Sequence, residues 1–200
     1  MGRPLKNDRL DAQAYLDWEA QQPGRSEYMD GEVFAMVGVR RVHATVAGNV
    51  FAALREHLRG SPCLAFTADM KLRVAPVDAF FYPDVMVTCN PQDRRADLFI
   101  EHPILVVEVL SDSTAAYDRG AKFASYRQVP ELQEYVLIDI APRRVEVYRR
   151  QPGNEWLLHD YAGEPECRFD SVKLTLSQTT VFEDVDTAED PAPTAPADLQ

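Results

Sequence analysis

One short apolar run constrains the fold of this chain more than any other feature. Residues 104–111 read ILVVEVLS, and all but one of them suit a strand that is buried on both faces in the middle of a packed sheet. The exception is Glu108, a carboxylate at the centre of the run. Burying an unpaired carboxylate is costly, and the group normally avoids the cost by taking up a proton. The fold must therefore provide Glu108 with a partner or a proton.

A second run has the same character. Residues 80–87 read FFYPDVMV, and Asp84 is the one charged residue among them. Two acids, each alone in an apolar strand, predict one shared cation. Mg²⁺ prefers oxygen ligands and keeps several of its waters, so two protein carboxylates are enough to hold it. We therefore expect Asp84 and Glu108 to bind a divalent cation.

Length and composition predict an ordinary globular domain. Two hundred residues can bury most of their apolar surface in a single core, and the hydrophobic share of 46% is typical of such a domain. No run approaches the roughly 18 apolar residues of a membrane span. The polar start of the chain lacks the apolar core of a signal peptide. We expect a cytoplasmic protein that does not contact a membrane.

The three cysteines predict neither a disulfide framework nor a zinc cluster. Cys63, Cys89 and Cys167 are odd in number and lack the CxxC spacing of zinc sites.

The net charge of −11 argues against a general nucleic-acid binder. Much of it comes from the last 19 residues, 182–200, which carry acids but no Lys or Arg: Glu183, Asp184, Asp186, Glu189, Asp190 and Asp198. This segment is also rich in Ala and Pro, a composition typical of a disordered tail. Paired arginines elsewhere suit solvated turns as well as phosphates. The charge therefore lowers the expectation of a nucleic-acid partner without excluding it.

Periodicity gives the elements in outline. An Asp-Gly turn at residues 30–31 joins two strand-like runs and predicts a hairpin. Helices are expected at residues 11–21, 43–58 and 111–128, and further strands at 63–66, 70–74, 80–87, 104–111, 134–140, 144–150 and 155–161.

Several polar residues have two interpretations at this point. Asp118 and Lys122 lie four residues apart on one helix face, which suits an ordinary surface ion pair or a lysine that reaches the two acids. Glu27 and Glu32 flank the hairpin turn, either exposed or facing a site together. His43, at a helix start, suits a structural hydrogen bond or a functional role.

At these residues the sequence resembles the Uma2 family, which belongs to the PD-(D/E)xK superfamily of restriction-endonuclease-like nucleases. The resemblance rests on Pro83 and Asp84, on EVLS at 108–111 and on DRGAKFASY at 118–126. It also takes in EYMDGE at 27–32 and His43, and covers roughly residues 12–180. It implies an α/β (α+β) fold with a restriction-endonuclease-like central mixed sheet flanked by helices. The expected domain is 12–181, between a lead-in at 1–11 and the tail.

The resemblance also implies roles for single residues. Asp84 and Glu108 would be catalytic metal ligands for Mg²⁺ or Mn²⁺, helped by the Val109 carbonyl. The superfamily's lysine, two residues after the Glu, is Leu110 here, which cannot do the work of a lysine. Similar proteins have moved this lysine to the following helix, which makes Lys122 the catalytic candidate. Glu32 would be a further acid near the metal, with Glu27 as the second choice.

Three functions remain open from the sequence. The leading hypothesis is a metal-dependent endodeoxyribonuclease that hydrolyses DNA phosphodiester bonds, with a homodimer as a possible assembly. A non-catalytic nucleic-acid- or protein-binding module on the same fold would explain Leu110 and the acidic charge. A phosphodiesterase acting on a small nucleotide would suit the acidic surface. No sequence feature names a DNA target.

Overall fold

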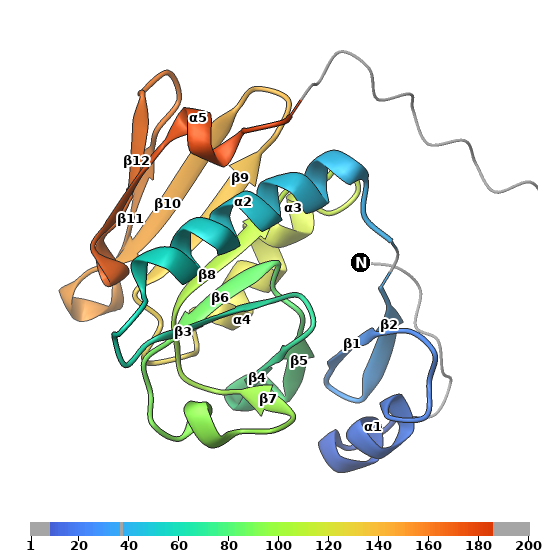
Figure 1. The fold of residues 1–200 in the computed structure, drawn as a ribbon. Coiled ribbons are helices and arrows are strands. Elements are labelled where there is room, and N and C mark those ends of the chain that lie inside the picture. The colour runs from blue at the N-terminus through green and yellow to red at the C-terminus, as the bar shows by residue number, and fades with distance from the viewer. Residues whose placement is uncertain (1–8, 37, 186–200) are drawn as a thin grey trace, which may run out of the picture.

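The core of the molecule is a six-stranded mixed sheet (Figure 1). The computed structural model describes residues 9–36 and 38–185. The strand order is β11-β10-β9-β8-β6-β3, in which β8 and β9 run parallel and the other neighbours antiparallel. The strands are β3 (Leu64–Thr67), β6 (Val85–Thr88), β8 (Pro103–Val109), β9 (Glu134–Asp139), β10 (Arg144–Arg150) and β11 (Trp156–Asp160). This sheet, with helices on both faces, confirms the predicted fold class.

Two smaller sheets accompany it. The first has five strands in the order β2-β1-β5-β4-β7, and the second is a hairpin of β12 and β13. Their bounds are β1 (Ser26–Met29), β2 (Glu32–Ala35), β4 (Lys71–Val74), β5 (Ala79–Phe81), β7 (Phe99–Ile100), β12 (Glu166–Phe169) and β13 (Leu174–Ser177). Short 3-10 turns lie at Ala75–Val77, Asp93–Arg95, Pro152–Asn154 and Asp170–Val172. The predicted hairpin is β1 and β2, closed by the Asp30-Gly31 turn.

The long helix α2 (Arg41–His57) covers one face of the six-stranded sheet, as Figure 1 shows. Its buried stripe of Val42, Val46, Val50 and Leu54 recurs every four residues and packs on strand residues such as Val107. Successive side chains of a strand point to opposite faces. Glu108 therefore faces away from α2, toward the helical segment on the other side of the sheet.

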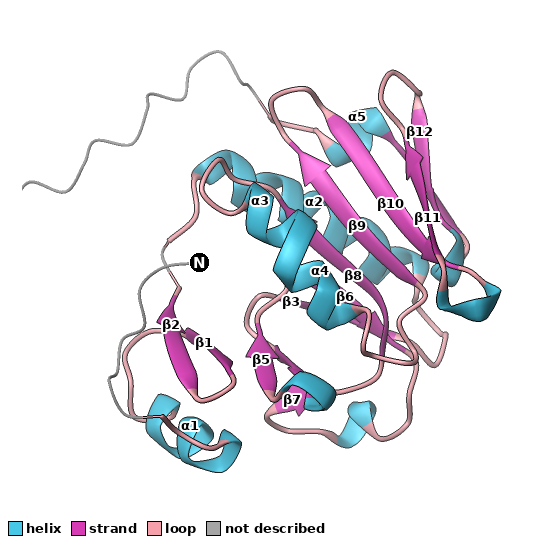
Figure 2. Cartoon of the chain, turned by 180° about the vertical axis from the view of Figure 1, so that it is seen from behind, coloured by secondary structure: helices cyan, strands magenta, loops and turns pink. Residues whose placement is uncertain are grey.

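That segment differs from the single regular helix predicted at residues 111–128. It consists of α3 (Ala115–Tyr117), a π-helical turn (Asp118–Lys122) and α4 (Phe123–Tyr126), seen in front of the sheet in Figure 2. A π-helical turn inside an α-helix shifts the side chains that follow it, and such turns are frequent at functional sites. Apart from its chain neighbours and the backbone of its own helix, no heavy atom of the described residues lies within 4 Å of the position a Cβ would take at Gly120, so packing against other elements does not explain that glycine.

The N-terminal helix and hairpin form a small aromatic cluster. Tyr15 of α1 (Ala12–Glu19) stacks on Tyr28 with ring centroids 5.0 Å apart, and Phe80 of β5 completes the cluster. Tyr28 also pairs with Phe80 in the antiparallel β1–β5 ladder. This packing fixes β1, and with it Glu27, against the rest of the fold.

The strand predicted at residues 80–87 is two strands in two different sheets. β5 ends at Phe81 and β6 begins at Val85, so Asp84 lies at the junction rather than inside a strand. Pro83 has no N–H to donate to a ladder, which explains the break. The prediction of one continuous strand is therefore wrong.

The part of the cysteine prediction that concerns disulfides is also wrong. Cys63 and Cys89 form a disulfide, while Cys167 is free and buried. The antiparallel ladder pairs Leu64 of β3 with Thr88 of β6, and the two cysteines lie one position beyond that pair. The separation of 26 residues along the chain gives no sign of this contact.

The packed domain extends past the predicted boundary at residue 181. After α5 (Gln178–Val181), Phe182 and Val185 are both buried in the core cluster that includes the apolar stripe of α2. The rest of the predicted tail, 186–200, lies outside the described residues, as does most of the predicted lead-in. Among the described residues, no helix has the length and apolar character needed to cross a bilayer.

Candidate active site

Asp84 and Glu108 lie opposite one another. The antiparallel β6–β8 ladder pairs Val85 with Val107, so the next position in that register brings Asp84 next to Glu108. Residues directly opposite in such a pair have Cβ atoms about 4.5–5.5 Å apart. The two acids that the sequence singled out are therefore neighbours in space.

Two elements fix the orientation of the Asp84 carboxylate. Its Oδ1 lies 2.9 Å from Nε2 of His43, in the first turn of α2. Its Oδ2 accepts a hydrogen bond of 2.7 Å from the backbone N–H of Val109. Val109 therefore contributes its amide to the site, and a role for its carbonyl stays a prediction.

Glu108 is almost completely buried and has two close partners. Its Oε1 lies 2.9 Å from Nζ of Lys122 and accepts a 2.7 Å hydrogen bond from the Tyr126 hydroxyl. Burial is the largest influence on its pKa and disfavours the charged form. The Lys122 ammonium opposes this effect and the nearby Asp84 reinforces it, so the pKa of Glu108 is raised to about 8.

Lys122 joins three acids. Its Nζ lies 2.9 Å from Glu108, 3.2 Å from Glu27 and 3.8 Å from Asp118. Burial alone would lower the pKa of this amine, but the three carboxylates outweigh it and raise the pKa well above its ordinary value. Lys122 and Asp118 are only 6% and 3% exposed, so the surface-pair interpretation is wrong.

The hairpin supplies Glu27 to this cluster. Directly opposed residues of an antiparallel pair share a face, as do alternate residues of one strand. Glu27 lies opposite Phe34 and Glu32 lies opposite Met29, so both acids point to the same face of the hairpin. Glu27 contacts Lys122 and accepts a 3.4 Å hydrogen bond from the Tyr82 N–H. Glu32 is exposed beside the turn. The position predicted for Glu32 is therefore taken by Glu27.

The lysine beside Glu108 comes from a different element than position 110. Leu110 is buried in the apolar cluster that includes Phe123, as its side chain requires. Lys122 comes from the π-helical turn on the same side of the sheet and reaches the carboxylate of Glu108. The geometry thus agrees with a lysine that has moved from position 110 to the following helix.

The donor set suits a hard divalent cation. Asp84 and Glu108 offer carboxylate oxygens, and an ionised carboxylate can accept more bonds than those described above. Within the described ranges, no three His, Cys, Asp or Glu side chains gather in the manner of a metal site. A cation held here by the two acids would complete its coordination with water, which suits Mg²⁺.

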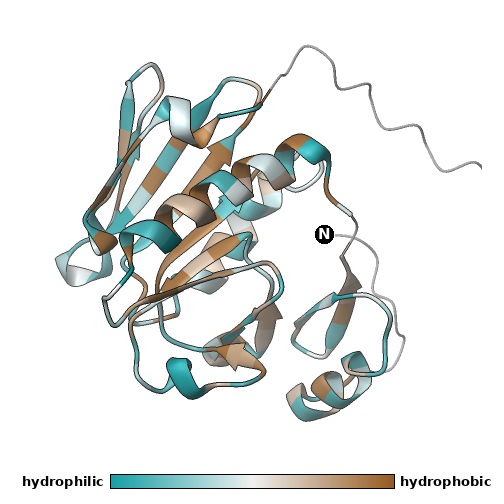
Figure 3. Ribbon diagram, viewed as in Figure 1, coloured by the Kyte–Doolittle hydropathy of each residue, from teal (hydrophilic) through white to brown (hydrophobic). Residues whose placement is uncertain are grey.

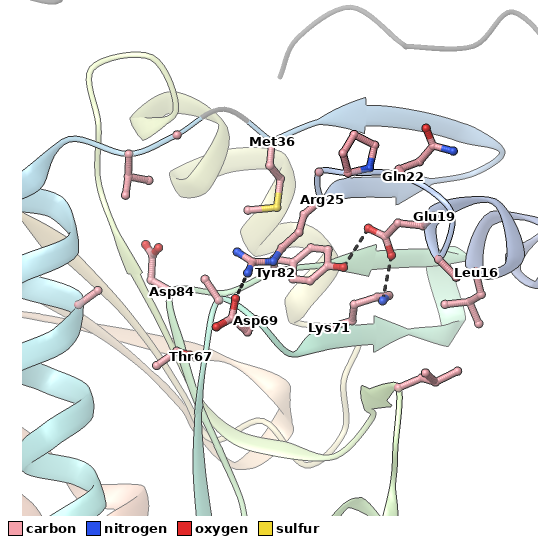
Figure 4. A pocket seen from close by; sticks show the side chains of 18 of the residues that line it. Leu16, Glu19, Gln22, Arg25, Met36, Thr67, Asp69, Lys71, Tyr82 and Asp84 are labelled. Atoms are coloured by element: carbon pink, nitrogen blue, oxygen red, sulfur yellow. Dashed lines mark hydrogen bonds and ion pairs between the residues drawn. The ribbon is translucent and has the colours of Figure 1, made fainter.

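Asp84 and His43 open onto a cleft of about 960 Å³ (Figure 4). Its walls come from α1 and the loop after it, from the first half of α2, and from the turn between β3 and β4. Arg25, Lys71 and Tyr82 lie in this lining. None of the three was predicted from the sequence, because a cleft wall built from distant segments leaves no periodic pattern.

A mixed sheet with a Glu on a central strand, an Asp just before the neighbouring strand, and a Lys from the flanking helix beside the Glu defines a protein of nuclease-like fold. Comparison with known families gives the particular group. The family model of Uma2, described as "Putative restriction endonuclease", matches residues 12–179. The chain belongs to the Uma2 family.

Individual proteins agree with this assignment. Two proteins of Synechocystis sp., the uncharacterized proteins slr1290 and sll1609, are 34% identical over 174 residues and 35% identical over 168 residues. These matches cover 87% and 82% of this chain, and 92% and 95% of the relatives. A crystal structure from Anabaena variabilis, titled as a "putative nuclease belonging to DUF820", shares the fold with a TM-score of 0.71 and 19% identity. That likeness covers 86% of this chain and 97% of the other.

Proposed function

We propose that this protein is a metal-dependent endonuclease that hydrolyses phosphodiester bonds in DNA. The observation that carries the proposal is the 2.9 Å contact between Lys122 and Glu108, which itself lies opposite Asp84. This contact joins the two metal-binding candidates to a buried cation that could act on a phosphate bound beside them. The replacement of the superfamily's lysine by Leu110 was the feature that most favoured a non-catalytic module. A lysine beside Glu108 weakens that argument.

Asp84 and Glu108 would hold the cation. When bound, Mg²⁺ or Mn²⁺ supplies polarisation of the phosphodiester and a lowered pKa for a bound water. His43 and the Val109 amide keep the Asp84 carboxylate in one orientation, so the carboxylate loses little conformational freedom when a metal ion binds. Glu108 must give up its proton for this role, and the Lys122 ammonium favours that loss.

Lys122 would act on the phosphate itself. Its ammonium is held in place by Glu27 and Asp118 as well as by Glu108. A cation fixed in this way can orient the attacking water and offset the negative charge that develops on the phosphate oxygens. Because the site is buried, that electrostatic stabilisation is stronger than it would be in water.

A small nucleotide is the second candidate substrate. The cleft of about 960 Å³ lies within the size range of small-molecule sites, and its lining includes Asp17, Glu19 and Asp69 as well as Asp84. An acidic lining disfavours a long polyanion more than a single nucleotide. The homodimer named as a possible assembly stays a prediction.

Cleavage assays separate these functions. Supercoiled plasmid and a dinucleotide with one phosphodiester would be incubated with the wild type, with Asp84→Asn, and with Asp97→Asn as an exposed control. We expect plasmid cleavage only with Mg²⁺ or Mn²⁺, lost in Asp84→Asn and kept in Asp97→Asn. Cleavage of the dinucleotide alone would favour the second candidate. Activity that is indifferent to Asp84 would contradict both.

A further inference from the structure

We propose that Arg25 binds a phosphate of the substrate strand beside the scissile one, and that Asp69 holds Arg25 in the free protein. The inference rests on the proposed nuclease function and deepens it, because it makes the substrate a polynucleotide chain rather than a single nucleotide. Arg25 and Asp69 both line the cleft that contains Asp84.

The hairpin presents Arg25 on the same face as Glu27. The Arg25 carbonyl accepts a 3.0 Å hydrogen bond from the Met36 N–H, which extends the β1–β2 ladder by one step. Alternate residues of a strand share a face, so Arg25 and Glu27 point to one side, away from the buried Tyr28. Two residues span about 7 Å along a strand. Glu27 contacts Lys122, so Arg25 lies two strand residues away from an acid that pairs with Lys122.

The Arg25 guanidinium reaches across the wall of the cleft. Figure 4 shows it directed at Asp69, with which it forms an ion pair. Its Cζ lies 6.0 Å from the centre of the Tyr82 ring, and Tyr82 is two residues from Asp84 in the chain. The guanidinium is therefore held near the acid that would bind the metal.

The pair with Asp69 is weak enough to be exchanged. The two side chains are 50% and 72% exposed, and an ion pair at such exposed positions contributes little to the free energy of folding. A guanidinium can make two parallel, charge-assisted hydrogen bonds to one phosphate. Exchanging Asp69 for a phosphate would therefore cost little and gain a stronger contact.

The other Lys or Arg in the described lining, Lys71, already forms an ion pair with a buried acid. Its Nζ lies 2.9 Å from the buried Glu19, which also accepts hydrogen bonds from the Ser26 N–H and the Tyr82 hydroxyl. Drawing Lys71 toward a substrate would leave a buried carboxylate without its cation, which is costly. Arg25 is thus the lining cation that can change its partner.

The test relies on two variants that should shift the Kd for DNA in opposite directions. Binding of a short fluorescein-labelled oligodeoxynucleotide, single- and double-stranded, would be followed by anisotropy in EDTA at low salt. Arg25→Gln should raise the Kd about tenfold, the effect of one charge-assisted hydrogen bond, and reduce the salt dependence by about one phosphate contact. Asp69→Asn should lower the Kd by roughly threefold, because it frees Arg25 and removes a like charge.

A matched ion pair serves as control. Arg73 and Glu101, 3.5 Å apart and partly exposed, lie outside the cleft lining, so Arg73→Gln and Glu101→Gln should leave the Kd unchanged. A merely structural Arg25–Asp69 pair would shift the Kd in the same direction in both variants. That result would overturn the inference, as would an unaltered Kd in Arg25→Gln or a wild type that binds neither strand form.

Failure of this inference is distinguishable from failure of the proposed function. If plasmid is not cleaved, yet Arg25→Gln and Asp69→Asn shift the Kd in opposite directions, the nuclease proposal fails and the phosphate contact stands. If plasmid is cleaved in an Asp84-dependent way and Arg25→Gln leaves both Kd and KM unchanged, the nuclease stands and the phosphate contact fails.

Discussion

His43 and Asp84 are joined by a 2.9 Å contact between the imidazole Nε2 and the carboxylate Oδ1, across 41 residues of sequence. Both side chains are nearly buried, and the contact ties the start of α2 to the junction between β5 and β6. Together with the Val109 amide on Oδ2, it leaves the Asp84 carboxylate little freedom to rotate. In the proposed metal site the histidine would thus act through Asp84, as a positioning residue.

Removing this contact should weaken metal binding while leaving the fold intact. We expect His43→Phe to lower the affinity for Mn²⁺ by about tenfold or more, the usual effect of losing a partner that orients a metal ligand. Isothermal titration calorimetry measures the affinity, and Asp84→Asn should abolish the binding. His159, an exposed histidine paired with Glu164, provides the control variant His159→Phe. Equal Mn²⁺ affinities in His43→Phe and His159→Phe would contradict the assigned role.

Replacing Lys122 should remove catalysis but not the metal. Lys122→Met keeps the apolar stem, and we expect cleavage to fall by about a hundredfold or more, the effect of losing one transition-state donor. Without metal, Glu108 and Asp118 can be protonated in this variant, because burial already raises the pKa of both groups. A metal ion that binds Glu108 would displace its proton, so the metal affinity should fall much less than the cleavage rate. A thermal melt would verify that the variant is folded.

Asp118→Asn is the comparison, since it alters the longest of the three contacts of Lys122. Its effect on cleavage should be small. An enzyme that depends on Asp84 yet tolerates Lys122→Met would exclude the relocated lysine, and Glu27 and His43 would then be the next candidates.

Glu108 should give the metal-free protein a distinctive pH dependence. Its pKa is raised from 4.5 to about 8, so between these values the native state binds more protons than the unfolded chain. The contribution of Glu108 to the free energy of unfolding must therefore fall as the pH rises from about 4.5 to about 8. Urea melts in EDTA at a series of pH values, compared with Glu108→Gln, isolate this contribution. Exposed Glu155→Gln serves as control. If the free energy of unfolding of the wild type, relative to that of Glu108→Gln, rose with pH, Glu108 would have a lowered pKa in the native state and the prediction would be contradicted.

Truncations should locate the end of the packed domain. Removing residues 187–200 should leave the melting temperature unchanged, as expected from their acidic, Ala- and Pro-rich composition. Removing residues 182–200 also deletes Phe182 and Val185, both buried, and burial of each such side chain contributes about 1.5–3 kcal/mol. We therefore expect a clear drop in melting temperature for the longer truncation only. Equal melting temperatures would contradict the packing of these two side chains.

Local patterns predicted most of the elements. The stripe of α2, the Asp-Gly hairpin and the apolar strands all appear in the structure close to their expected bounds, because side-chain periodicity reports directly which face is buried. The failures came where a local pattern ran across a junction. Pro83 divides an apolar run between two sheets, and a π-helical turn interrupts an otherwise regular helical segment.

The sequence by itself singled out Asp84 and Glu108, since charged residues within apolar segments need a partner once buried, and the resemblance to the Uma2 family added Lys122. Only the tertiary structure decided which groups those partners are. Strand register set Asp84 opposite Glu108, helix placement brought Lys122 to both Glu108 and Glu27, and antiparallel pairing joined Cys63 to Cys89. These contacts span many residues of chain and depend on register and packing angle, which no short window of sequence encodes.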